Sequence, residues 1–83
     1  MIIVHYYPFD VNSNVTVVQD GKYLHESIPS NTEDFPEAVY QLVQDYHDNE
    51  VKLYGPRDIL QETLTYMNKN YSNNNIQIEV IEA

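Results

Sequence analysis

Hydrophobic and polar residues follow two different periods along the chain, and the helical period is clearest in the middle. There, six apolar residues recur every three or four positions and form one continuous stripe. They are Phe35, Ala38, Val39, Leu42, Val43 and Tyr46. The pattern predicts an amphipathic helix over residues 35–46. Asp34 and Glu37 resemble a capping box at its start, and Pro36 is tolerated because first-turn amides lack partners within the helix.

A second helical stripe follows later in the chain and predicts a helix over residues 57–71. Its members are Ile59, Leu60, Thr63, Leu64, Met67 and Tyr71. A run of three asparagines, residues 73–75, favours a turn after this helix, because asparagine tolerates left-handed backbone.

The remaining apolar segments are short, rich in β-branched and aromatic residues, and bounded by turn formers, which indicates strands. They cover residues 2–7, 15–19, 22–28, 51–54 and 76–80. Asp20-Gly21 predicts a tight hairpin between the second and third of them, because both residues tolerate positive φ. Residues 10–14 are polar and favour a turn, and Gly55-Pro56 ends the fourth strand.

The predicted element order is βββαβαβ, in one domain that spans residues 1–83. Right-handed crossovers place both helices on the same side of the sheet. We therefore predict an α/β two-layer sandwich with a mixed five-stranded sheet and two helices on one face. In it, strands 1, 4 and 5 are parallel, and strand 2 is antiparallel to strand 1.

Charge and composition restrict the classes of partner. Thirteen acidic residues against four basic ones give a formal net charge of −9, which disfavours direct binding of nucleic acid or of anionic membranes. The chain has no cysteine, no basic leader and no apolar run long enough for a membrane span, so we expect a cytoplasmic protein. The abundance of Asn, Ile and Tyr, with a single Arg, is typical of AT-rich genomes, and favours a bacterial or phage accessory protein.

The element order resembles that of the ribonuclease H-like superfold, which includes the half-domains of actin-like ATPases. Residues 9–15 are similar to the actin-like phosphate loop, in which Asp precedes a glycine-containing turn, although Val11 and Ser13 stand where glycine is expected. The resemblance implies a role for Asp10 in binding a metal or a nucleotide. A second carboxylate would come from Glu37, and residues 54–56 lack the third.

Catalytic chemistry has few candidates beyond that resemblance. A zinc triad would need His5, His25 and His47 to converge, but two lie on predicted strands and His47 lies at a helix end, where the helix dipole favours it. No nucleophile motif accompanies the serines. We therefore predict a protein that is not an enzyme and that has no cofactor, no metal site and no catalytic residues.

Eight tyrosines in 83 residues are the most unusual feature of the composition. Tyrosine is enriched at protein interfaces, and a two-layer sandwich leaves one sheet face uncovered. We predict a protein-binding or self-associating module, with a homodimer as one form, whose interface contains His5, Tyr7, Tyr23 and Tyr54. The alternative reading of the tyrosines is ordinary packing at the edges of a thin core.

A second function is a DNA-mimicking inhibitor of a nucleic-acid enzyme. In that case one side of the first helix presents a row of acidic and amide side chains to a basic groove. The row consists of Glu33, Glu37, Gln44 and Asp48. A third function, implied by the resemblance, is a degenerate nuclease or nucleotide binder that uses Asp10.

Overall fold

The computed structural model describes residues 1–70 and 76–82, which form five strands and two helices in the predicted order. The elements are β1 (Ile2–His5), β2 (Asn12–Gln19), β3 (Lys22–Pro29), α1 (Phe35–Tyr46), β4 (Glu50–Gly55), α2 (Arg57–Asn70) and β5 (Gln77–Glu82). α1 has its predicted limits, and α2 begins at Arg57 as predicted. The part of the second predicted stripe at Tyr71, and the turn at residues 73–75, lie outside the described residues.

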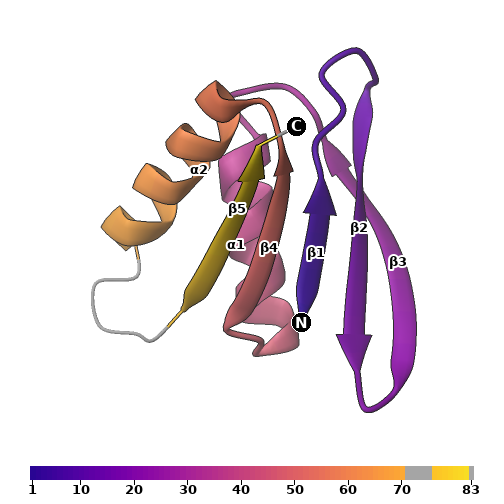
Figure 1. Ribbon diagram of the computed structural model, residues 1–83. Helices are drawn as coiled ribbons and strands as arrows, with labels where there is room; N and C mark the ends of the chain where they lie inside the picture. The colour runs from indigo at the N-terminus through magenta and orange to yellow at the C-terminus, as the bar shows by residue number, and fades with distance from the viewer. Residues whose placement is uncertain (71–75, 83) are drawn as a thin grey trace.

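The strands form one mixed sheet in the order β3-β2-β1-β4-β5. β1 is parallel to β4, β4 is parallel to β5, and β2 is antiparallel to both of its neighbours, β1 and β3. Both helices lie on the same face, with α1 behind the centre of the sheet and α2 beside it (Figure 1). The predicted two-layer α/β sandwich is therefore confirmed.

The core lies between the helices and the even-numbered side chains of β1. Ile2 and Val4 of this central strand are fully buried, and so are Phe35 and Val39 of α1. The strands on both sides of β1 add their own buried aliphatic residues to the same layer, because residues paired across a sheet share a face. These are Val15 and Val17 of β2 and Val51 and Leu53 of β4. The stripe on α2 closes the layer with Ile59, Leu60 and Met67.

Two local predictions about the hairpin and the first strand are wrong. β2 begins at Asn12 rather than at residue 15, because Ser13 and Asn14 pair with Ile28 and Ser27 across the hairpin and extend its ladder. β1 ends at His5 rather than at residue 7. The ring of Tyr6 turns to the helix side and contacts Phe35 edge-on, with centroids 4.8 Å apart.

The start of α1 also differs from prediction. Asp34 has a helical backbone, and its side chain makes no capping hydrogen bond, so the capping box is wrong. Its Oδ2 instead accepts a hydrogen bond from Asn31 Nδ2 at 2.9 Å, in a turn that leads into the helix. Pro36 lies in the first turn as predicted, and His47 ends the helix with a left-handed backbone at φ 50°. In the described part of the chain, neither helix is long and apolar enough for a bilayer crossing.

Candidate functional site

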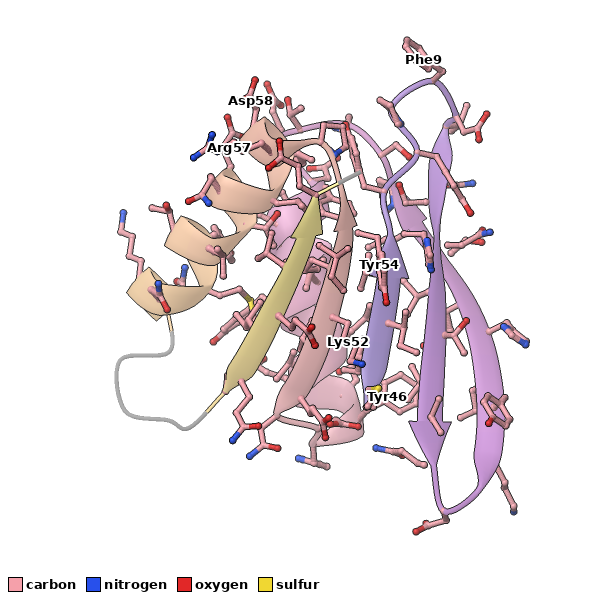
Figure 2. All side chains as sticks on the ribbon, in the orientation of Figure 1. Phe9, Tyr46, Lys52, Tyr54, Arg57 and Asp58 are labelled. Atoms are coloured by element: carbon pink, nitrogen blue, oxygen red, sulfur yellow. The ribbon has the colours of Figure 1, made fainter. Side chains whose placement is uncertain are left out.

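The candidate site is the face of the sheet that the helices do not cover, which we call the open face. Register places the odd-numbered side chains of β1 on it: Ile3 lies between Thr16 and Lys52, and His5 lies between Asn14 and Tyr54. Figure 2 shows Lys52 and Tyr54 on this side of the ribbon. Along each strand, alternate side chains fill the core, and the side chains between them form the open face.

Three aromatic side chains form a row along this face. The rings of His5 and Tyr54 are stacked, with centroids 4.5 Å apart and planes 4° from parallel. Their strands are neighbours in register, and neighbouring strands lie about 4.8 Å apart, so the two rings meet face to face. Tyr7 extends the row, with its ring 6.5 Å from that of His5. We call His5, Tyr7 and Tyr54 the aromatic row.

The aromatic row remains accessible to a partner. Tyr7 is 37% exposed, His5 is exposed and Tyr54 is half-buried. Of the four residues predicted for the interface, these three come together. The fourth, Tyr23, is 68% exposed on the same face, but it lies on the edge strand β3 opposite Val18, two strands away from β1.

A shallow hollow of about 490 Å³ lies beside the aromatic row, between β1 and the β2–β3 hairpin. Its polar lining includes Asn14, Thr16, His25 and Ser27. Thr16 Oγ1 and His25 Nδ1 are 3.4 Å apart across the hairpin. Sequence reasoning did not assign His25 or Thr16 to the site, although the predicted two-residue turn fixes the pairing that brings them together.

Few acidic side chains lie on the open face. Among the thirteen acids, strand register places only Glu50 and Glu79 there, at the end formed by β4 and β5. Glu79 lies 3.8 Å from Lys52, and this pair neutralises part of the charge. The net charge of −9 therefore comes mainly from the loops, the hairpin and the helix side.

Asp10, the residue singled out by the resemblance to a phosphate loop, lies in a second hollow of about 660 Å³ at the end of the sheet. Its other lining residues are uncharged. Ser13, at an expected glycine position, is fully buried: its Oγ accepts a hydrogen bond from the Tyr7 amide at 3.0 Å and lies 2.7 Å from Ser30 Oγ. Ser13 thus joins the ends of three strands rather than facing a ligand.

The described residues do not bring together the groups needed for metal chemistry. Within residues 1–70 and 76–82, no cluster of three or more His, Cys, Asp or Glu side chains is placed to hold a metal ion. Glu37 lies on α1, and Tyr54 belongs to the aromatic row on the opposite face of the sheet. The three histidines lie on β1, on β3 and at the end of α1, on separate elements.

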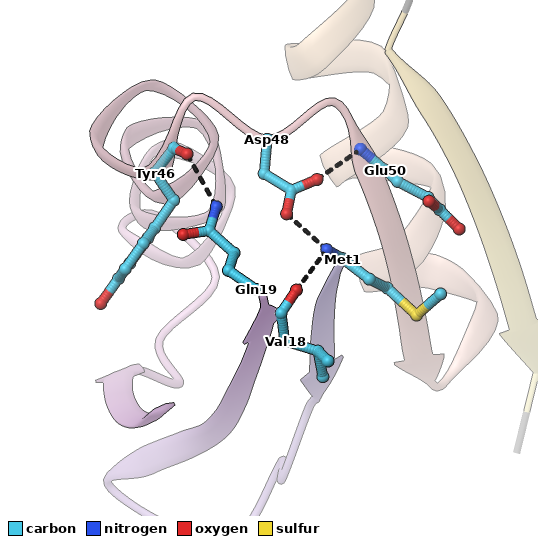
Figure 3. Close-up of polar contacts among 6 residues, drawn as sticks. All are labelled: Met1, Val18, Gln19, Tyr46, Asp48 and Glu50. Carbon is cyan, nitrogen blue, oxygen red and sulfur yellow. Dashed lines mark hydrogen bonds and ion pairs between the residues drawn. The ribbon is translucent and has the colours of Figure 1, made fainter. Parts of the chain in front are cut away.

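The residues of the acidic row predicted for a DNA mimic lie on and beside α1. Only Glu37 and Gln44 lie within α1, because Glu33 precedes the helix and Asp48 follows it. The Asp48 carboxylate forms an ion pair with the N-terminal ammonium of Met1 (Figure 3). Burial raises the pKa of Asp48, but hydrogen bonds from this ammonium and from the Glu50 amide outweigh burial and hold the pKa below its usual value. Asp48 is thus committed to a contact within the chain.

No protein-family model, curated protein or solved structure matches the chain.

Proposed function

We propose that the protein is a non-enzymatic binding module that contacts a protein partner through the open face of its sheet. The observation that carries this proposal is the parallel stack of His5 on Tyr54, extended by Tyr7, on a face that no described helix covers. Flat aromatic side chains offer a large contact area and lose little conformational freedom on binding, so they are frequent anchors of protein interfaces.

The surroundings of the aromatic row support a protein partner. Ile3 and Ile81 lie on the same face, next to Lys52 and Tyr54 respectively, so the row continues into apolar surface. Burial of apolar area stabilises a complex by about 25 cal/mol per Å² before the costs of association. The scarcity of acids on this face lowers the electrostatic cost of covering it. A polar rim is provided by Asn14 and Thr16.

The two other functions stay predictions with weaker support. A DNA mimic needs rows of closely spaced carboxylates, and the Asp48 carboxylate, which follows α1, is paired with the Met1 ammonium. A nucleotide- or metal-binding role for Asp10 rests on one carboxylate in a hollow whose other lining residues are uncharged. Likewise, the ribonuclease H-like resemblance stays a proposal based on element order.

The test compares substitutions on the open face with a matched substitution elsewhere. Tyr7→Lys and Tyr54→Lys put a flexible charge into the aromatic row. Phe9→Lys makes the same kind of change at a residue that is 99% exposed on the β1–β2 loop, away from the row. Each immobilised chain is used to capture proteins from a bacterial lysate, and a captured protein is then purified and its affinity measured by calorimetry.

We expect one captured protein to bind the unmodified chain and the Phe9→Lys variant equally. We expect the Tyr7→Lys and Tyr54→Lys variants to bind it at least about tenfold more weakly, as is usual for central aromatic anchors. Circular dichroism checks that each variant keeps its fold. Equal capture by all four chains, or no specific capture by the unmodified chain, would contradict the proposal.

A further inference from the structure

The outer edge of β3 is a second surface that can bind another strand. β3 is the last strand on its side of the sheet, and all its residues except Ile28 are exposed. No described helix or loop lies beside its outer edge (Figure 1). A strand in this position presents unpaired amide and carbonyl groups, and these are a template for another strand.

The hydrogen-bond pattern shows which backbone groups of β3 face outward. The Ser30 amide donates to the Val11 carbonyl, and the Val18 amide donates to the Met1 carbonyl on the other side of β2. Successive residues of a strand point their amide and carbonyl groups to opposite sides. Counting back from Ser30 in steps of two, the backbone groups of Leu24 and Glu26 therefore face β2. Those of Tyr23, His25 and Ser27 face the open edge.

We propose that a second copy of this chain pairs with this edge, antiparallel, with the two-fold axis at Leu24. In this register, the outward amide and carbonyl of Tyr23 pair with those of His25 in the second copy, and the reciprocal pair forms on the other side of the axis. The two sheets then continue as one. Because the axis is perpendicular to the sheet, both aromatic rows lie on the same side of the dimer.

Charge complementarity selects this register. Lys22, one of only four basic residues, lies opposite Glu26 of the second copy, and symmetry makes this ion pair twice. The Tyr46 hydroxyl donates a hydrogen bond to Oε2 of Glu26, which orients the carboxylate and leaves Oε1 for Lys22. The other edge strand, β5, carries Glu79 and Glu82 and no basic residue, so it lacks such complementarity.

Apolar packing favours the same register. Leu24 is 45% exposed in the single chain, on the helix side of the sheet. At the two-fold axis it faces Leu24 of the second copy as a non-hydrogen-bonded pair, in which side chains approach most closely. On the open face, Tyr23 lies beside His25 of the second copy. The edge pairing depends on the backbone and side chains of β3, and it stands whether or not the open face binds a partner.

The experiment measures molecular mass by sedimentation equilibrium from micromolar to millimolar concentration. Leu24→Lys places two like charges at the axis, and Lys22→Glu places like charges opposite Glu26. The double variant Lys22→Glu/Glu26→Lys exchanges the two charges and keeps them complementary. The matched controls are Val11→Lys, at an exposed apolar residue of the β1–β2 loop, and Lys69→Glu, at an exposed basic residue of α2. Circular dichroism checks the fold of every variant.

We expect a concentration-dependent dimer for the unmodified chain and for both controls. Leu24→Lys and Lys22→Glu should each raise the dimer dissociation constant at least about tenfold, and the double variant should recover most of the loss. Amide hydrogen exchange of Tyr23 and His25 should slow as concentration rises. A chain that stays monomeric at millimolar concentration would overturn the proposal, as would a dimer that survives Leu24→Lys and Lys22→Glu. If Leu24→Lys prevents folding, the charge exchange at Lys22 and Glu26 decides alone.

Discussion

At the scale of single residues, Asp48 joins parts of the fold that are far apart in sequence. Its carboxylate pairs with the Met1 ammonium and accepts a hydrogen bond from the Glu50 amide at 3.1 Å. The same ammonium donates to the Val18 carbonyl at 2.9 Å, so the contact joins the start of β1, the end of β2 and the loop before β4 (Figure 3). The Asp48 side chain is only 10% exposed, so solvent screens this ion pair less than a surface pair.

We expect Asp48→Asn to lower the free energy of unfolding by about 1 kcal/mol at neutral pH. The folded-state pKa of Asp48 is lowered from 3.8, so its stabilising effect is present above that pH and is lost as the pH falls through the folded pKa. The difference between the unmodified chain and the variant should therefore shrink below pH 3.8. Urea unfolding across a pH series checks this.

Asp45→Asn provides the control, because the Asp45 carboxylate is exposed and accepts only a side-chain hydrogen bond from Gln41 on the surface of α1. Its stability should stay within a few tenths of a kcal/mol of the unmodified chain. A cost of Asp48→Asn that is the same in acid and at neutral pH would show that the ion pair is not the source.

At the scale of elements, the hydroxyls of Ser13 and Ser30 hold the β1–β2 connection against the end of β3. Both residues are buried, and the Ser13 hydroxyl also accepts the Tyr7 amide. We expect Ser13→Ala to lower the free energy of unfolding by about 1–3 kcal/mol, because it leaves the part-buried Tyr7 amide and the buried Ser30 hydroxyl without these partners. Ser30→Ala should cost less, because Ser13 keeps its bond to Tyr7. Thermal and urea unfolding of both variants and of the double variant measure the coupling.

The double variant should cost less than the two single variants added together, because residues that share a hydrogen bond are not independent. Ser27→Ala is the control, since Ser27 is an exposed serine of β3 and its substitution should be nearly neutral. Strictly additive costs would mean that the hydroxyl–hydroxyl contact contributes nothing to stability.

The elements that sequence predicts well are those whose signal is local. The stripe on α1 and the Asp20-Gly21 turn each determine their own geometry, and the turn also fixes the register that places Thr16 beside His25. The start of β2 depends instead on the partners that β3 supplies across the hairpin, so its polar residues resemble a loop in isolation. The side-chain role of Asp34 changes for the same reason, because Asn31 competes for its carboxylate.

The aromatic row was only partly predictable. Period-two alternation places His5 and Tyr7 on one face of β1, but it does not say which face the helices cover. The stack of His5 on Tyr54 depends on the parallel register of β1 and β4, which are separated by most of the chain. Tyr23 shares the face but not the row, because two strands of the sheet lie between β3 and β4.

At the scale of the whole molecule, the net charge of −9 is spread over a body of 32 × 28 × 20 Å. The Debye length is about 30 Å at ~10 mM salt and about 10 Å at ~0.1 M, so added salt screens the repulsion between these charges. We expect the urea midpoint and the melting temperature to rise over this range, because self-repulsion in the compact state is screened.

This measurement uses a concentration at which the chain is monomeric, and choline chloride replaces sodium chloride in a control to exclude binding of a specific cation. A midpoint that falls with added salt would mean that attractive pairs dominate the electrostatics of the folded chain. The candidates for such an effect are the Met1–Asp48 and Lys52–Glu79 pairs.

The position of β1 in the middle of the sheet has a consequence for the order of folding. β1 pairs with β2, the next element in sequence, whereas its other neighbour, β4, is synthesised only after β3 and α1. Until then, β1 is the unpaired edge of a three-stranded meander whose apolar face awaits both helices. Closing the long loop to β4 is slow relative to forming the hairpin, because distant contacts must first overcome the entropy of the intervening chain. The nascent meander is therefore the stage at which this protein is most prone to aggregation.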